Sequence, residues 1–398
     1  MYTGVGRQTR RDAGDGDPLK INWIKKIIRL NCECLFALAE RNYEMNVDFS
    51  KKPLIILAGP TAVGKTSTSV ALAKALNGEI VSADSVQVYR GLDIGSAKVT
   101  KQEMDGVPHH LIDVIDVDTD YDVQLFQQMA TEAIDGIYRR GHIPILVGGT
   151  GFYIQALLYG IDFTEEDDAK HQEVSVRLQA IADQPGGPEQ LYAHLREVDP
   201  ASTEKIHAHN IRRVIRALSF YELHGSPISA HNEEESRKTA IYDSVFFVLN
   251  DEREKLYQRI NQRVEGMLSD GLLDECIRLR ARNLPPERTS MKGIGYREVL
   301  AALDTILAYQ RGISIEEAAK TTVSEAELRA LPLETPENRV IMAQAVAKIQ
   351  QNSRNYAKRQ LTWFRRERDV HWVELQNFEY KKEKIVEWII ETCSEHWA

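Results

Sequence analysis

The sequence predicts an α/β fold, in which a parallel β-sheet is flanked by helices and carries a helical insertion. Short apolar runs alternate with stretches of helical periodicity, as they do where helices connect parallel strands. A glycine-rich loop lies between the first apolar run and the first helical stretch. A long stretch of helical periodicity without a strand pattern separates the third apolar run from the fourth.

Five segments are expected to form the strands, because each is short, apolar and rich in β-branched or aromatic residues. They span residues 54–57, 80–82, 143–147, 244–249 and 371–375. A helix after the first strand is indicated by the spacing of its apolar residues, Val70, Leu72, Ala73 and Leu76. The same alternation continues along the chain, so the segments predict one parallel sheet.

Residues 59–66 fit the pattern G-x-x-x-x-G-K-[ST] between a strand and a helix, which is the context of a phosphate-binding loop. Its glycines let backbone N–H groups close around an anion, and the helix N-terminus adds positive partial charge. Lys65 adds a full charge, and Thr66 adds a hydroxyl that can bind Mg²⁺. We therefore expect a diphosphate or triphosphate to contact Gly59, Pro60, Thr61, Ala62, Val63, Gly64, Lys65 and Thr66.

The third apolar run leads into Gly148, Gly149, Thr150 and Gly151 and has no aspartate at its end. Most proteins that transfer a γ-phosphoryl group hold Mg²⁺ with an aspartate after a second strand. Its absence counts against an ordinary ATPase or kinase. The glycines either leave room for a substrate beside the phosphates or form a tight turn from strand to helix.

Asp84 follows the second predicted strand, and ligands of α/β sheets lie outside the carboxyl ends of the strands. We therefore expect Asp84 beside the phosphate loop, where its carboxylate could bind Mg²⁺, cap a helix or take a proton. Gln87 and Tyr89 come soon after it. Their planar polar side chains are suited to gripping the edge of a nucleobase and stacking on it.

These motifs resemble those of the tRNA dimethylallyltransferases, also called tRNA isopentenyltransferases, of the bacterial type. The similarity runs in family order over residues 53–375, in the blocks 59–66, 84–89, 91–98, 108–113, 147–153, 210–218, 292–297 and 356–363. The resemblance implies a fold like that of the P-loop NTPases. It also implies transfer of a dimethylallyl group from dimethylallyl diphosphate to N6 of an adenosine beside the anticodon of tRNA.

The resemblance further assigns roles to residues. The phosphate loop would hold the donor diphosphate, with Mg²⁺ as cofactor at Thr66. Asp84 matches the general base of the family, and Thr150 matches the hydroxyl that positions the amine. The tRNA would contact Asp84, Ser85, Val86, Gln87, Thr150, Arg177, Arg212, Arg213, Arg216, Lys292, Gly293, Ile294, Gly295, Tyr296 and Arg297. Ser219 stands where the family usually has an acidic residue. This difference puts in doubt a salt bridge at that position, but it does not affect the expected reaction.

Two other functions are compatible with a phosphate loop. An enzyme of the same fold could prenylate free adenine nucleotides, and an ATPase or kinase could act while bound to RNA. The net charge of −9 is unusual for an RNA-binding protein, but a local basic surface decides binding. One basic cluster is formed by Arg212, Arg213 and Arg216, and another by Lys348, Arg354, Lys358, Arg359, Arg365, Arg366 and Arg368.

The composition is that of an ordinary soluble protein, with 43% hydrophobic and 27% charged residues among 398. Its four cysteines are too scattered for a disulfide framework, and no motif for zinc is present. We expect a cytoplasmic protein with no membrane partner that acts as a monomer.

Five regions are expected along the chain. Residues 1–50 form a partly disordered N-terminal extension, in which 21–40 could form an amphipathic helix, and 1–44 precede the similarity to the family. The rest divides into a first part of the core (51–164), a helical insertion that contacts tRNA (165–208), a second part with a basic C-terminal helical region (209–380) and a C-terminal helix (381–398). Residues 313–336 are longer than the family pattern leads us to expect.

Overall fold

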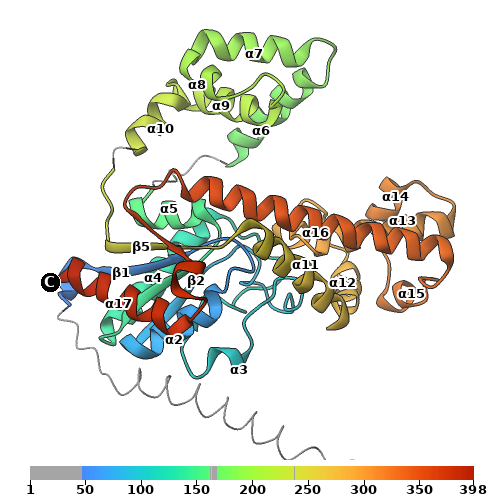
Figure 1. The fold of residues 1–398 in the computed structure, drawn as a ribbon. Helices are drawn as coiled ribbons and strands as arrows, with labels where there is room; N and C mark the ends of the chain where they lie inside the picture. The colour runs from blue at the N-terminus through green and yellow to red at the C-terminus, as the bar shows by residue number, and fades with distance from the viewer. Residues whose placement is uncertain (1–46, 162, 164–167, 237) are drawn as a thin grey trace, which may run out of the picture.

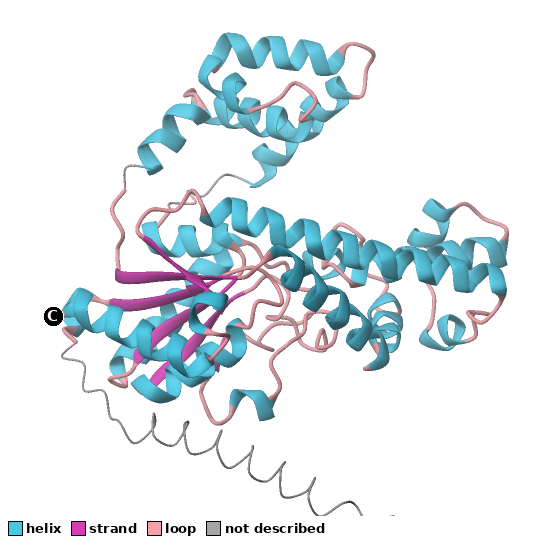
Figure 2. Cartoon of the chain, in the orientation of Figure 1, coloured by secondary structure: helices cyan, strands magenta, loops and turns pink. Residues whose placement is uncertain are grey.

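The computed structural model describes residues 47–161, 163, 168–236 and 238–398. The segments expected to be disordered (1–18) and helical (21–40) lie outside this part of the chain. Within it, six strands form one parallel sheet with helices on both faces (Figures 1 and 2). The predicted α/β class is therefore confirmed.

The strands lie in the order β3-β2-β4-β1-β5-β6. In chain order they are β1 (Pro53–Ala58), β2 (Gly78–Ala83), β3 (His109–His110), β4 (Ile143–Gly148), β5 (Asp243–Asn250) and β6 (Val370–Glu374). All five predicted strands are confirmed with slightly shifted ends. β3 was not predicted, because two residues are too few to show a period.

The carboxyl ends of the three central strands are level with one another. Gly148, the last residue of β4, pairs with Ala58 at the end of β1 and with Ala83 at the end of β2. The loops that follow these strands therefore leave the sheet side by side. One is the phosphate loop, one begins with Asp84, and one contains Thr150.

The apolar residues of β1 point alternately to the two faces of the sheet. Leu54 and Ile56 join the core formed with α4 (Val123–Arg139) and α5 (Gly151–Tyr159). On the other face, Ile55 and Leu57 pack with α2 (Lys65–Leu76) and α17 (Lys382–Trp397), which corresponds to the expected C-terminal helix.

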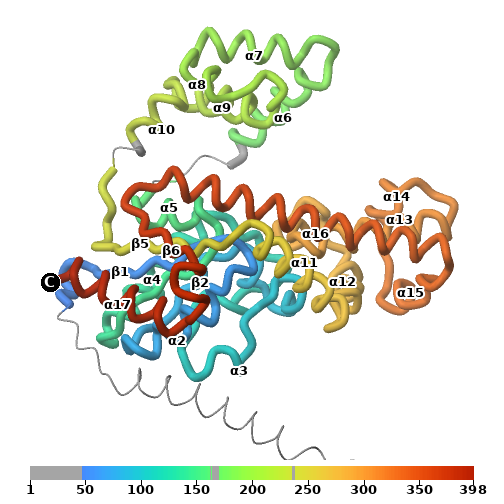
Figure 3. Tube along the Cα trace, in the orientation of Figure 1, coloured from blue at the N-terminus to red at the C-terminus, as the bar shows by residue number. Residues whose placement is uncertain are grey.

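A second group of helices follows β5 along the chain. It contains α11 (Arg253–Ser269), α12 (Leu272–Arg280), α13 (Tyr296–Arg311) and α16 (Pro336–Phe364). Thr335 caps α16 by accepting from the backbone N–H of Asn338, and Pro336 occupies its first turn. This long helix runs from α5 past α11 and α13 (Figure 3). Shorter elements are η1 (Phe49–Lys51), α3 (Lys101–Met104), η2 (Thr289–Lys292) and η3 (Leu375–Phe378).

The longer segment at 313–336 folds into two short helices, α14 (Ile315–Lys320) and α15 (Glu325–Arg329). Its anchor is the buried Arg280. The Arg280 guanidinium pairs with Asp304 at 2.7 Å and donates to the carbonyl oxygens of Ala318 and Thr321 at 2.8 and 3.0 Å. The segment is therefore an ordered extension at the far end of α13 and α16.

A separate helical lobe stands over the sheet (Figure 1). It contains α6 (Asp168–Ala182), α7 (Gly187–Val198), α8 (Pro200–Lys205), α9 (Ile211–His224) and α10 (Ile228–Ser236). Leu178, Leu191 and Leu218 share one hydrophobic cluster, which joins α9 to α6 and α7. The predicted end of the insertion at residue 208 is therefore wrong, because the lobe continues to α10.

Candidate active site

The loop between β1 and α2 has the backbone shape of an anion-binding loop. Gly59 and Gly64 have φ angles of 149° and 103°, which side chains rarely allow. A Cβ at Gly59 would also lie 2.6 Å from the carbonyl oxygen of Leu249, so no larger residue fits there. No side chain caps the start of α2 at Lys65, so its first N–H groups stay available to an anion.

Two of the cations at this loop, Lys65 and Arg263, also line the cavity beside it. Lys65 Nζ donates to the carbonyl oxygens of Gly59 and Pro60 at 2.9 and 2.8 Å. Arg263, which reaches the loop from α11, donates to the Thr61 hydroxyl at 3.3 Å. No motif marks Arg263 in the sequence, and only the fold brings it here.

Lys65 and Arg263 are both partly buried, and burial shifts their pKa values. Burial, reinforced by the nearby Arg263, lowers the pKa of Lys65 to about 7, although Asp84 opposes the shift. Burial also lowers the pKa of Arg263. Because a bound anion would stabilise the charged form of both side chains, the site is suited to a diphosphate.

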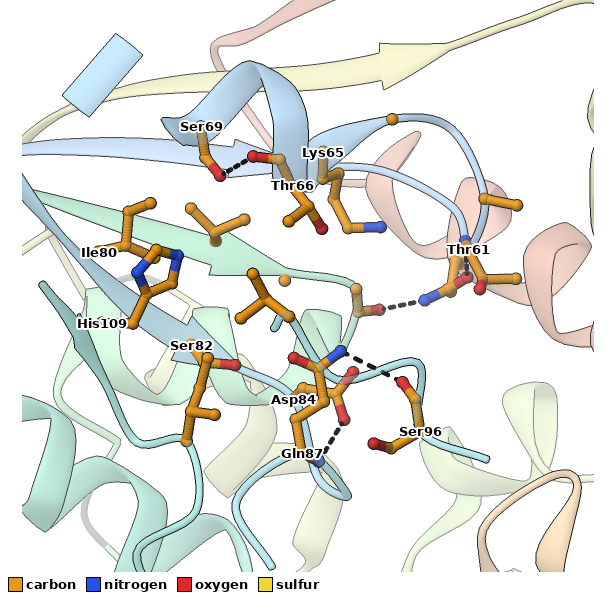
Figure 4. Close-up of a pocket in the computed structure, with 18 of the residues that line it drawn as sticks. Thr61, Lys65, Thr66, Ser69, Ile80, Ser82, Asp84, Gln87, Ser96 and His109 are labelled. Atoms are coloured by element: carbon orange, nitrogen blue, oxygen red, sulfur yellow. Dashed lines mark hydrogen bonds between the residues drawn. The ribbon is translucent and has the colours of Figure 1, made fainter. Parts of the chain in front are cut away.

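Asp84 lies across the cavity from Lys65 and Thr66 (Figure 4). Its Oδ1 atom accepts from the backbone N–H groups of Val86 and Gln87 at 2.8 and 3.2 Å, so Asp84 caps the turn after β2. Its Oδ2 atom makes no hydrogen bond to the part of the chain that the structure describes. Asp84 can therefore cap the turn and still offer one carboxylate oxygen to a ligand.

Two cavities of about 280 Å³ each adjoin at Asp84. The first follows the phosphate loop and also has an apolar wall, formed by Ile80, Val99, Ile112 and Val147. The second lies between the start of α13 and the middle of α16, and its basic residues are Arg263, Lys292, Arg297 and Arg359. The residues that line both cavities are Thr61, Asp84, Ser96, Arg263 and Tyr356.

The loop at 91–98 contributes Ser96 to both cavities and is held from behind by a buried carboxylate. Glu275 accepts from the backbone N–H groups of Asp93, Ile94 and Gly95, each at 2.9–3.0 Å. It also accepts from the Tyr296 hydroxyl. Three N–H groups directed at one carboxylate fix the loop backbone.

Two tyrosines do not have the exposure that the sequence-based interpretation assumed. Tyr296 is fully buried and packs behind the loop at 91–98, so the prediction that its side chain contacts tRNA is wrong. Tyr89 is also fully buried, and its hydroxyl donates to the carbonyl oxygen of Thr119. It therefore cannot stack on a nucleobase. Both residues belong to the core that supports the site.

The glycines at the end of β4 and just after it are packed closely against other parts of the protein. A Cβ at Gly148 would lie 2.3 Å from the carbonyl oxygen of Ala83, and one at Gly151 would lie 2.2 Å from Trp363. The interpretation as a tight turn is thus confirmed, although Gly148 and Gly149 also line the first cavity. Thr150 lines neither cavity. Its Oγ1 is buried without a well-aligned hydrogen bond in the described chain, close to the Tyr356 phenol.

The other predicted tRNA contacts fall into two groups. Around the second cavity, the structure brings together Ser85, Val86, Lys292, Gly293, Ile294 and Arg297, and Gly295 starts α13 beside them. On the lobe, the exposed Arg212, Arg213 and Arg216 lie on α9, and Arg177 of α6 pairs with Glu222. Gln87 lines the first cavity only, and its Nε2 donates to the carbonyl oxygen of Ser96 at 3.3 Å.

The residues present fit a Mg²⁺ ion that binds through few protein ligands. In the described chain, no group of three or more His, Cys, Asp or Glu side chains could enclose a metal ion. Thr66 is exposed at the start of α2 and lines the cavity opposite the Asp84 carboxylate. Mg²⁺ usually keeps several waters and binds one or two protein groups together with phosphate oxygens.

No helix among the described residues is long and apolar enough to cross a membrane.

The fold and the site define an α/β protein with a phosphate loop and a second cavity next to it. The chain belongs to the IPP transferase family, whose model matches residues 87–367, and residues 52–119 match the model for isopentenyl transferase. It is a prenyl-transferring transferase, and the resemblance inferred from the motifs is confirmed.

Proteins with curated names and solved structures agree with this assignment. The tRNA dimethylallyltransferase of Lachnoclostridium phytofermentans is 42% identical over 82% of this chain and 93% of its own length. That of Bacillus subtilis is 40% identical over 84% and 96%. The crystal structure of the full-length tRNA isopentenylpyrophosphate transferase from Bacillus halodurans has a TM-score of 0.57 and 38% identity, and covers 87% of this chain and 98% of its own.

A eukaryotic dimethylallyltransferase, described as captured in crystallographic snapshots while acting on tRNA, is also similar. Its TM-score is 0.59 at 28% identity, and the match covers 81% of this chain and 74% of that one.

Proposed function

We propose that this protein transfers the dimethylallyl group of dimethylallyl diphosphate to N6 of an adenosine beside the anticodon of a tRNA. The bond between C1 and oxygen in the donor breaks, a bond from C1 to N6 forms, N6 loses a proton and inorganic diphosphate leaves. The observation that carries this proposal is the place of Asp84 at the boundary of two adjoining cavities. One cavity has the features of a diphosphate site, and the other has a basic lining.

The first cavity suits the donor. The diphosphate would be bound by the phosphate-loop N–H groups, Lys65 and Arg263. These groups would also offset the negative charge that grows on the diphosphate as its bond to C1 breaks. Mg²⁺, when bound at the Thr66 hydroxyl, supplies further positive charge to the leaving diphosphate. The apolar wall of this cavity accommodates a hydrocarbon group better than a ribose.

The second cavity suits an adenosine taken out of the RNA stack. Enzymes that act on a nucleobase extrude it into a pocket. Tyr356 and Arg359 line this cavity, and the Arg359 guanidinium lies 5.7 Å from the centre of the Tyr356 ring. The free Oδ2 of Asp84 would accept the N6 proton as the new bond forms. Thr150 remains the second residue that we assign to positioning the amine, and Gln87 remains a candidate for contact with the base edge.

The alternative of a phosphate-loop ATPase or kinase is less consistent with the structure. β4 ends at Gly148 and supplies no aspartate. Asp251, which follows β5, is occupied by Arg259 at 2.5 Å and by the Tyr380 hydroxyl at 3.0 Å. The Arg259 guanidinium in turn donates to the carbonyl oxygen of Ala62. Asp251 therefore supports the phosphate loop and does not serve as a metal ligand.

The basic lining of the second cavity and the exposed arginines of the lobe favour tRNA over a free nucleotide. We further propose that the lobe contacts the RNA backbone. We also propose that the protein acts as a monomer. We expect the protein to act in the cytoplasm, where its substrate tRNA is found.

The test is an assay with radiolabelled dimethylallyl diphosphate and one of two acceptors, tRNA or AMP. A separate reaction contains ATP and no prenyl donor. We expect label in tRNA alone, with competition by excess inorganic diphosphate. Label in AMP at a comparable kcat/KM would indicate a nucleotide prenyltransferase. Steady release of ADP without a prenyl donor would identify an ATPase and overturn the proposal.

A further inference from the structure

We propose that Gln360 is a positioning residue that couples tRNA binding on α16 to diphosphate binding on the phosphate loop. The inference rests on the function proposed above, because it requires both substrates. Gln360 is only 5% exposed. Its Oε1 accepts from the backbone N–H of Thr61 at 3.0 Å, and its Nε2 donates to the carbonyl oxygen of Gly149 at 2.9 Å. One amide thus joins three segments that are far apart in the sequence.

Each of these segments belongs to a different part of the site. Thr61 lies in the phosphate loop, and Gly149 lies in the turn that leads to Thr150. The fit around the amide is close, because a Cβ at Gly149 would lie 2.1 Å from Gln360 Nε2. The loss of either hydrogen bond would leave a polar atom of the buried Gln360 amide unsatisfied, which is unfavourable. The phosphate loop and the turn are therefore held to the position of α16.

The part of α16 that contains Gln360 also faces the second cavity. Tyr356 lines both cavities, Arg359 lines the second, and Trp363 packs on Gly151. Their spacing of three or four residues places them on neighbouring positions of one helix face. A tRNA that binds Arg359 and stacks on Tyr356 would fix this turn of the helix. Gln360 would then fix the phosphate loop in the shape that binds diphosphate.

Such coupling is reciprocal, so each ligand must raise the affinity for the other by the same factor. The measurement is the affinity for inorganic diphosphate with Mg²⁺, in the presence and absence of saturating tRNA, by calorimetry. We expect tRNA to tighten diphosphate binding in the wild type by about 5- to 150-fold, the usual range for coupled sites.

Gln360→Met keeps the length of the side chain and removes both hydrogen bonds. We expect the coupling factor to fall close to one, while tRNA affinity in the absence of diphosphate changes little. Asn355→Ala, an exposed position on the same helix, is the matched control and should keep the wild-type factor. A wild-type factor of one, or a wild-type factor retained in Gln360→Met, would overturn the proposal.

If Gln360→Met does not fold, Gly149→Ala is the second variant that tests the proposal. The added Cβ would displace the Gln360 amide and break its hydrogen bonds. It should lower the coupling factor in the same way, and an unchanged factor would overturn the proposal. The proposed function is judged separately by prenyl transfer to tRNA. If the wild-type protein binds diphosphate and tRNA but transfers no dimethylallyl group, the proposed function is overturned. The coupling factor can still be measured in that case, so the two proposals are tested separately.

Discussion

The Tyr296 hydroxyl donates a 2.6 Å hydrogen bond to Glu275 Oε1 and accepts a 3.1 Å hydrogen bond from the backbone N–H of Ser96. The N–H groups of residues 93–96 point toward Glu275 and Tyr296, and the carbonyl oxygens of Ser96 and Ala97 accept from side chains that line the site. Gln87 and Arg263 donate to the carbonyl oxygen of Ala97 at 3.5 and 3.4 Å. The side chains that shape this wall of the active site are therefore themselves buried behind it.

Tyr296→Phe removes only the hydroxyl and is expected to lower the free energy of unfolding by about 1–3 kcal/mol. The cause is the unsatisfied N–H of Ser96, together with the missing hydrogen bond to Glu275. The loop would then lose its fixed position, so kcat should fall as well. Urea unfolding and steady-state kinetics measure the two effects. Wild-type stability in the variant would show that water replaces the hydroxyl at no cost.

The lowered pKa of Lys65 predicts that diphosphate binding depends on pH. In the free protein, Lys65 loses its proton as the pH rises through about 7. A bound anion favours the charged form and raises that pKa, so the protein takes up a proton on binding. Affinity should therefore fall as the pH rises above 7, by up to about tenfold per pH unit. Calorimetry in buffers of different ionisation enthalpy counts the proton.

Lys65→Arg is the control for this pH dependence, because arginine stays charged throughout the range. The variant should bind diphosphate with a nearly constant affinity between about pH 7 and 9. Proton uptake of the same size in this variant would assign the effect to another group.

The three exposed arginines of α9 are expected to bind the tRNA backbone. The triple variant Arg212→Ala, Arg213→Ala and Arg216→Ala should weaken tRNA binding. It should also reduce the slope of log affinity against log salt by about one for each phosphate that the variant no longer neutralises. Filter binding at several salt concentrations gives the slope. Diphosphate affinity should not change.

Arg139→Ala, which removes an exposed arginine of α4, is the control for the triple variant and should leave the slope unchanged. Gln87→Ala should also keep the slope but relax the choice of base or slow the reaction. Equal loss of diphosphate binding in the arginine variant would mean that these residues do not act on RNA.

Local patterns were enough to predict much of the site. The phosphate loop, Asp84 and the turn before Thr150 each follow a short apolar strand. Parallel strands end at one edge of a sheet, so their loops must come together there. The pairing of Gly148 with both Ala58 and Ala83 shows this arrangement directly.

Other parts depend on packing between distant segments and leave no local pattern. Arg263 and Gln360 reach the phosphate loop from α11 and α16. Gln360 lies in the block 356–363 that resembles the family, but no local pattern shows that either residue contacts the loop. Tyr89 was interpreted from its planar polar side chain and Tyr296 from the resemblance to the family, but tertiary packing buries both. The end of the lobe was placed too early, because the apolar side of α9 packs on α6 and α7 and not on the sheet.

Asp84→Asn is expected to slow prenyl transfer by about 10²–10⁴, the usual contribution of a general base. An asparagine can still accept from the backbone N–H of Val86, so the turn should be retained. Rapid-quench measurement of a single turnover gives the rate of the chemical step, and calorimetry checks that diphosphate affinity changes little. A rate within a few-fold of wild type would show that Asp84 only caps the turn and is not the general base.

The most direct test of the whole account is product analysis after reaction of the wild-type protein with dimethylallyl diphosphate, Mg²⁺ and unmodified tRNA. Mass spectrometry of the tRNA nucleosides should find the dimethylallyl group on N6 of an adenosine beside the anticodon. Inorganic diphosphate should form in an equal amount. A tRNA that stays unmodified, with no inorganic diphosphate formed, would contradict the account.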